Sequence, residues 1–301
     1  MLRRIGLILG LIGLLAGCGG GRTTGSAGDV RVVSGRLVRV VTTTTQLSDF
    51  SRIVGGDRVD VYDVIKANVD AHDYEPTPAD IEALGTADLV VRNGAGLEEW
   101  LEPTLDSAGS EALVVDATDG VELRDGDPHV WHDASRARAM VAGVSRALAT
   151  VNPENAPTYS AHEGAYAAQL DALDGEIRTA IASLANRKLV TNHDAFGYFV
   201  ERYGLEFVGS VIPSFDSQAE LSSRELSSLV ARIRTEGAKA VFSEASLPPK
   251  TAETIAKEAG VRVVAGDDAL YGDSLGPVGS EGDTYLKMMR HNTRVIVDNL
   301  R

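Results

Sequence analysis

The segment Ala71-His72-Asp73-Tyr74-Glu75-Pro76-Thr77-Pro78 is the starting point for interpreting this 301-residue chain. It follows the apolar run Val59 to Ile65, which is typical of a buried β-strand, so His72 lies just past a strand end. Thr77 and Pro78 then predict the capped start of a helix. In open α/β sheets, ligands bind beyond the carboxyl ends of strands. His72 is therefore a candidate ligand-binding residue.

Three other polar residues follow apolar runs in the same way. They are His129 after the run 112–115, His193 after 188–191 and Asp273 after 261–265. Three imidazoles and one carboxylate form a four-coordinate set that suits a borderline-soft divalent ion such as zinc. On spacing alone, however, a histidine after a strand is more often a loop residue than a metal ligand.

Strands and helices are expected to alternate through both halves of the chain. Apolar, β-branched runs predict strands at 36–43, 59–65, 88–92 and 112–115, and again at 188–191, 206–211, 238–243 and 261–265. Alternation with helices at this spacing indicates mostly parallel sheets covered on both faces. We therefore expect an α/β fold of two four-stranded lobes, with the candidate site in the cleft between them.

Apolar residues recur at intervals of three and four from Pro157 to Leu184, which predicts one long helix. At 1.5 Å per residue this helix is about 40 Å long, which exceeds the need of one lobe. We expect a backbone helix that joins the lobes; a helix along one lobe is the alternative. The predicted domains are an N-terminal α/β lobe at 36–133, helices including the backbone helix at 134–185, and a C-terminal α/β lobe at 186–301.

The N-terminus has the pattern of an export signal. A positive start precedes twelve apolar residues, Ile5 to Ala16, too few to span a bilayer, so 1–17 is predicted to be a signal peptide. The run ends Leu15-Ala16-Gly17-Cys18, which resembles the lipobox of bacterial lipoproteins. Cys18, the only cysteine, is then the lipidation site, and 18–35 a flexible tether. A plain signal peptide with an incidental cysteine is the alternative.

The charge of the chain restricts its partners. A formal net charge of −14 argues against nucleic acid and against an anionic membrane surface as electrostatic partners, since both repel an acidic protein. The same charge suits a protein that collects cations.

Five motifs occur in the order found in the cluster A-I solute-binding proteins of zinc and manganese ABC importers, which this chain resembles over nearly all of its mature length. They are HDYEPTP (72–78), DPHVW (127–131), HDAFGYF (193–199), LYGDSLG (270–276) and YLKMMRHN (285–292). The resemblance implies two α/β lobes joined by a backbone helix, with the metal held by His72, His129, His193 and Asp273. It also implies an extracytoplasmic, lipid-anchored protein, expected to be a monomer, whose partner is the membrane permease of an ABC importer.

The third ligand favours the zinc branch of this family. Manganese-preferring members carry a glutamate where this chain has His193. Imidazole suits zinc, whereas Mn²⁺ prefers harder oxygen ligands. Zn²⁺ is therefore the expected transported ligand, with a manganese-specific protein of the same family as the alternative. Many zinc members have a histidine-rich loop before the second ligand; here 120–127 is short and has no histidine.

Two glutamates are candidate supports for the ligands. Glu244, at the end of its predicted strand, is expected to accept a hydrogen bond from a ligand imidazole. Glu75 has the same candidate role, or else that of a negative charge near a helix N-terminus. Asp194 is expected to be a helix N-cap.

The other histidines are expected to lie outside the central set. His162 and His291 are far along the sequence from the four ligands and are expected to be structural. His132 is interpreted either as an accessory ligand or as a surface or capping residue.

A zinc hydrolase is the competing function from another class. Catalytic zinc sites keep one position open for water, with a general base nearby. Four protein ligands would fill a tetrahedral zinc, and the chain has no HExxH pairing. We therefore expect a binding protein and not an enzyme. Surface adhesion beside transport is a third function, which the sequence neither favours nor excludes.

Overall fold

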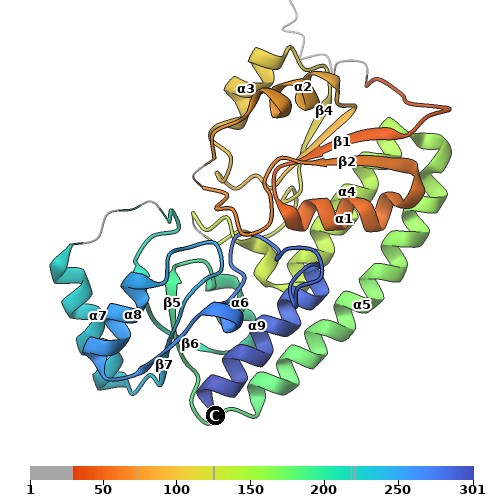
Figure 1. Ribbon diagram of the computed structural model, residues 1–301. Helices are drawn as coiled ribbons and strands as arrows, with labels where there is room; N and C mark the ends of the chain where they lie inside the picture. Colours follow the sequence, from red (N-terminus) through yellow and green to blue (C-terminus); the bar gives the residue numbers. More distant parts are fainter. Residues whose placement is uncertain (1–29, 73, 125, 218, 220–221) are drawn as a thin grey trace, which may run out of the picture. The chain divides into compact units, whose positions relative to one another are not determined.

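The computed structural model describes residues 30–72, 74–124, 126–217, 219 and 222–301 (Figure 1). From Arg31 onward these residues form two α/β lobes, each built on a four-stranded sheet. The predicted signal peptide and Cys18 lie outside the described residues. Within the described part of the chain, no helix has the length and apolar character needed to cross a membrane.

The first sheet has the strand order β2-β1-β3-β4, and its three pairings are parallel. Val40 and Val91 face the core shared with the second lobe, whereas Val41 and Val90 face the opposite core beneath α2 and α3, as the alternation of side chains in a strand requires. The elements are β1 (Val38–Thr42), α1 (Thr45–Gly55), η1 (Gly56–Arg58), β2 (Val59–Asp63), α2 (Pro78–Thr86), β3 (Leu89–Arg92), α3 (Leu101–Ala108) and β4 (Leu113–Asp116).

The predicted start of α2 is confirmed. Thr77 is the N-cap, and its hydroxyl accepts a hydrogen bond from the Asp80 backbone N–H. The Asp80 carboxylate in turn accepts from the Thr77 N–H at 2.7 Å, and Pro78 occupies the first helical position. This capping box satisfies two backbone donors and fixes where the His72 loop ends.

The second sheet has the order β6-β5-β7-β8, again with parallel pairings. Helices α7 and α8 cover one face. The elements are β5 (Lys188–His193), α6 (Gly197–Tyr203), β6 (Glu206–Ile212), α7 (Ser223–Glu236), β7 (Ala240–Phe242), α8 (Lys250–Ala259), β8 (Arg262–Val264), η4 (Gly266–Asp268) and α9 (Tyr285–Leu300).

The N-cap predicted at Asp194 is wrong. Helix α6 begins at Gly197, its N-cap is Phe196, and no side chain caps it. The backbone N–H of Asp194 instead donates to the Ser214 carbonyl at 3.1 Å. This contact comes from the loop after β6 and could not be predicted from local sequence.

The predicted backbone helix is confirmed. After η2 (Val130–His132), α4 (Ala134–Val151) and η3 (Pro153–Asn155), helix α5 runs from Ala156 to Ala182. It packs against α1 and α4 in the first lobe and against α6 and α9 in the second (Figure 1). A single rigid helix therefore contributes to both lobes.

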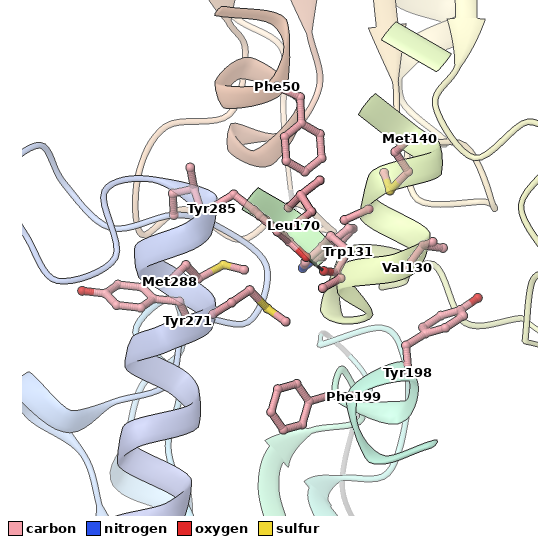
Figure 2. Packing of buried hydrophobic residues seen from close by; sticks show 14 of the residues in the cluster. Phe50, Val130, Trp131, Met140, Leu170, Tyr198, Phe199, Tyr271, Tyr285 and Met288 are labelled. Atoms are coloured by element: carbon pink, nitrogen blue, oxygen red, sulfur yellow. Dashed lines mark hydrogen bonds between the residues drawn. The ribbon is translucent and has the colours of Figure 1, made fainter. Parts of the chain in front are cut away.

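One hydrophobic core continues through both lobes around Trp131 (Figure 2). Its members come from α1, α4, α5, α6 and α9, and include Phe50, Met140, Leu170, Phe199, Tyr285 and Met288. Separate cores lie on the outer faces of the two sheets. Because the central core is continuous between the lobes, it fixes the position of the loops of one lobe relative to those of the other.

Trp131 links the two halves by hydrogen bonds as well as by packing. Its indole N–H donates to the Gly272 carbonyl at 3.0 Å, and the Tyr285 hydroxyl donates to the Trp131 carbonyl at 2.6 Å. His129 lies two residues before Trp131, and Asp273 directly follows Gly272. The core thus fixes two candidate site residues from different lobes relative to one another.

Candidate metal centre

The four candidate ligands lie beyond the carboxyl ends of strands in both sheets, as expected for an α/β fold. His193 is the last residue of β5. The others lie in loops: His72 after β2, His129 between β4 and η2, and Asp273 after β8 and η4. Residues separated by up to about 200 positions therefore meet at the lobe interface.

Their side-chain atoms converge. Nε2 of His129 lies 3.1 Å from Nε2 of His72 and 3.4 Å from Nε2 of His193. Oδ1 of Asp273 lies 3.4 Å from Nε2 of both His129 and His193, and 3.9 Å from that of His72. Ligands about 2.0–2.1 Å from a tetrahedral zinc ion are about 3.3 Å apart. The arrangement has the dimensions of a site for one small cation.

Carboxylates hold the outer nitrogens of two rings. Nδ1 of His129 lies 2.9 Å from Oδ1 of Asp127, and Nδ1 of His193 lies 2.9 Å from the Glu244 carboxylate. A neutral ring that donates from Nδ1 presents the lone pair of Nε2 to the cluster. Glu244 also accepts from the His193 backbone N–H at 2.9 Å. Both inner nitrogens are thus oriented to accept a cation.

The cluster is almost sealed from water. His129, His193 and Asp273 are fully buried, and neither carboxylate oxygen of Asp273 accepts a hydrogen bond from a described residue. A buried, unpartnered carboxylate is costly unless a positive charge lies beside it. Lone pairs of neutral imidazoles directed at that carboxylate add to this cost. A bound cation removes both costs, and in its absence a proton on a ring supplies the positive charge.

The charged side chains of the cluster shift one another's pKa values. Burial by itself lowers the pKa of His193, but the negative charges of Glu244 and Asp273 outweigh it and raise this pKa well above 6.5. Burial likewise opposes protonation of His129, but the hydrogen bond that its ring donates to Asp127 and the negative charge of Asp273 outweigh it and raise its pKa. Burial raises the pKa of Asp273, but the neighbouring imidazoles hold it well below 3.8. The carboxylate therefore stays ionised.

The two predicted supporting glutamates are placed differently. Glu244 is buried beside His193, as described above. Glu75 is exposed, and the structure places no hydrogen bond between it and any described imidazole. Asp127, which supports His129 in the same way as Glu244 supports His193, was missed in the sequence. The signal was the acidic residue two positions before His129 in the segment 127–131.

The remaining histidines lie outside the cluster of four. His162 and His291 contact the backbone carbonyls of Val54 and Ala269, at 3.0 and 2.9 Å. His132 is fully buried and stacks on Phe196 with ring centroids 4.4 Å apart. Burial lowers its pKa to about 3, so the ring is neutral. The surface or capping role considered for His132 is therefore wrong.

Two α/β lobes, a linking helix and a ligand cluster at the lobe interface define a solute-binding protein. Residues 40–299 match the family described as zinc-uptake complex component A, periplasmic (ZnuA). The chain belongs to this family of metal-binding proteins that serve ABC importers, and the predicted family and fold class are confirmed.

Relatives extend over almost the whole chain. The manganese-binding lipoprotein MntA of Halalkalibacterium halodurans is 30% identical over 299 residues, 95% of this chain and 94% of that protein. The iron ABC transporter substrate-binding lipoprotein MtsA of Streptococcus pyogenes serotype M1 is 28% identical over 318 residues, 99% of each chain. The periplasmic zinc-binding protein TroA of Treponema pallidum is similar in structure, with a TM-score of 0.82, 31% identity, and coverage of 88% of this chain and 99% of that chain. These relatives are named for three different metals.

Proposed function

We propose that this protein is an extracytoplasmic lipoprotein that captures Zn²⁺ with His72, His129, His193 and Asp273 and delivers it to the membrane permease of an ABC importer. The observation that carries the proposal is the convergence of one atom from each of these side chains to within 4.8 Å. Asp127 and Glu244 support it, because each orients one imidazole towards the common centre.

The site is suited to binding a metal ion and not to catalysing a reaction. Four protein ligands complete the tetrahedral shell of a zinc ion, whereas a catalytic zinc keeps one position for water. Three of the four ligands are fully buried, which leaves little room for a second substrate. We therefore propose a binding function and no enzymatic one.

The ligand set supports zinc over manganese. Three imidazoles and one carboxylate match the preference of zinc, and the relatives named for manganese and iron make Mn²⁺ the second candidate. His193→Glu replaces a nitrogen ligand with an oxygen ligand. It is expected to reduce the preference for Zn²⁺, measured as the Mn²⁺ dissociation constant divided by the Zn²⁺ dissociation constant, by about tenfold, equivalent to about 1.4 kcal/mol. Competition titration against a chromophoric chelator measures both constants.

The control for this substitution follows from the structure. In His193→Glu the new carboxylate would face Glu244, so the double variant His193→Glu/Glu244→Gln is measured as well, because the amide can donate to it. His162→Glu makes the same change outside the cluster. Tighter binding of Mn²⁺ than Zn²⁺ by the parent protein would contradict the zinc assignment.

We also propose that lipid on Cys18 anchors the protein to the outside of the membrane. The support is the Leu-Ala-Gly-Cys sequence at 15–18 and the relatives' description as lipoproteins. Burial of an acyl chain contributes about 0.8 kcal/mol per CH₂, and two or more chains give stable anchoring. Cys18→Ala is expected to move the protein from the membrane fraction to the medium or soluble fraction. Retention of this variant in membranes after a carbonate wash would refute the anchor.

A further inference from the structure

The four candidate ligands differ in how firmly the protein holds them. Three have fully buried side chains. Asp127 holds the ring of His129, Glu244 holds the ring of His193, and the Gln46 amide donates to the backbone carbonyl of Asp273 at 3.3 Å. Nδ1 of His72 has no hydrogen-bond partner among the described residues, and 9% of its side chain is exposed. His72 is therefore the least constrained of the four.

One carboxylate fixes the backbone at His72. Oδ1 of Asp70 accepts a hydrogen bond from the His72 backbone N–H at 2.9 Å. Oδ2 of Asp70 accepts one from the hydroxyl of Ser217, a buried residue after β6 in the second lobe. Among the described residues, this is the one side-chain hydrogen bond between the loop 64–77 and the second lobe, and it adds to the backbone bond from the Asn68 N–H to the Leu275 carbonyl at 3.3 Å. Asp70 thus couples the position of His72 to a contact between the lobes.

This contact lies at the mouth of the site. His72 lines a surface pocket of about 290 Å³ together with Trp100 and Glu99 of the first lobe and Asp216 of the second. Asp216 directly precedes Ser217. Since the other three ligands have no exposed surface, an ion that leaves the cluster while the core stays packed has to pass His72.

We propose that Asp70 is a positioning residue that holds His72 against the metal, and that the Asp70–Ser217 contact is a latch that opens when the metal leaves. This inference rests on the proposed metal-binding function. Loss of the Ser217 hydroxyl frees one side of the Asp70 carboxylate and leaves the bond from the Asn68 N–H to the Leu275 carbonyl, so the loop is loosened at His72 while it stays attached at Asn68. The expected consequence is faster metal release and no slower metal uptake.

Release of Zn²⁺, and in parallel Mn²⁺, from the loaded full-length protein into excess chelator tests the latch. Ser217→Ala is expected to increase the release rate by about tenfold, in line with the loss of one hydrogen bond to a charged acceptor. Asp70→Ala, which removes both bonds, is expected to increase it further. Ser217→Thr keeps the hydroxyl, and Asp70→Asn keeps an oxygen for His72 and a polar partner for Ser217, so both should release metal at nearly the parent rate.

The matched control is Ser227→Ala, because that hydroxyl bonds only within α7, to the Ser223 carbonyl at 2.8 Å. It should leave the release rate unchanged. Equal release rates for parent and Ser217→Ala would overturn the latch and leave the metal-binding proposal intact. A parent protein that binds neither ion would refute the proposed function itself. If Ser217→Ala does not fold, the comparison of Asp70→Ala with Asp70→Asn decides, and equal rates there would likewise overturn the latch.

Discussion

Replacement of His193 by alanine is expected to weaken Zn²⁺ binding by at least about 100-fold, since loss of a hydrogen-bond partner behind a ligand already costs about 10- to 100-fold. The zinc-dependent rise in melting temperature should shrink accordingly, because stabilisation by a ligand grows with the logarithm of its concentration relative to Kd. The truncation also leaves Glu244 buried without its ring partner. The readout is therefore the difference between melts with zinc and with chelator within each variant.

The other ligands and a control complete this experiment. His72→Ala and His129→Ala are expected to act in the same direction. His162→Ala should keep the affinity of the parent, because that imidazole contacts the Val54 carbonyl and lies outside the cluster. If His193→Ala retained the full zinc-dependent rise in melting temperature while His162→Ala lost it, the assignment of the metal site to the cluster would be wrong.

Acidification is expected to weaken Zn²⁺ binding by up to about 10⁴-fold between pH 7.5 and 5.5. An imidazole must lose its proton to bind the metal. Burial opposes protonation of His193 and His129, but the carboxylates of Glu244, Asp127 and Asp273 outweigh it and raise both pKa values above 6.5. Below its pKa each ring costs about tenfold in affinity per pH unit, so two rings cost about 100-fold per unit.

The sign of the stability change follows from the same pKa values. A raised pKa in the folded, metal-free protein contributes stability that is complete below about pH 6.5 and is lost as the pH rises through the raised value. Zinc-bound rings take up no proton and gain nothing on acidification. The gap between zinc and chelator melts should therefore narrow as the pH falls. Asp273, with its pKa held well below 3.8, adds nothing to the slope in this range.

Titrations at pH 7.5, 6.5 and 5.5, corrected for protonation of the competing chelator, measure this dependence. A Zn²⁺ affinity that stays constant over this pH range would show that metal binding does not require His129 and His193 to lose a proton. Replacement of Glu244 by glutamine removes one of the charges that raise the pKa of His193. In that variant the loss of affinity should begin at lower pH.

Local patterns in the sequence predicted the elements, and the family resemblance selected the four residues whose side chains the structure brings together. β-Branched runs predicted the strands because buried parallel strands are nearly continuous in apolar residues. His72 and His193 were selected as candidates because each lies at or just past the end of a predicted strand, where ligands bind in such folds. The long helix was recognisable because its apolar spacing persists for many turns.

Features that depend on the three-dimensional arrangement of side chains were not predictable in this way. Asp127 is only two positions from His129, but its role depends on how the loop folds its carboxylate back onto the ring. His132 was interpreted either as an accessory ligand or as a surface or capping residue, yet it stacks on Phe196 from the other half of the chain. The continuous core around Trp131 also joins lobes whose periodicities appear independent in the sequence.

The metal content of the mature protein, purified untagged and without chelator, is the most direct test of zinc capture at the cluster. Mass spectrometry of the purified protein is expected to find about one Zn²⁺ per chain, as a four-ligand site predicts. The His72→Ala variant, purified in the same way, should have lost most of it. A parent protein that carries mainly Mn²⁺ or no metal, or a His72→Ala variant with unchanged zinc, would contradict the account.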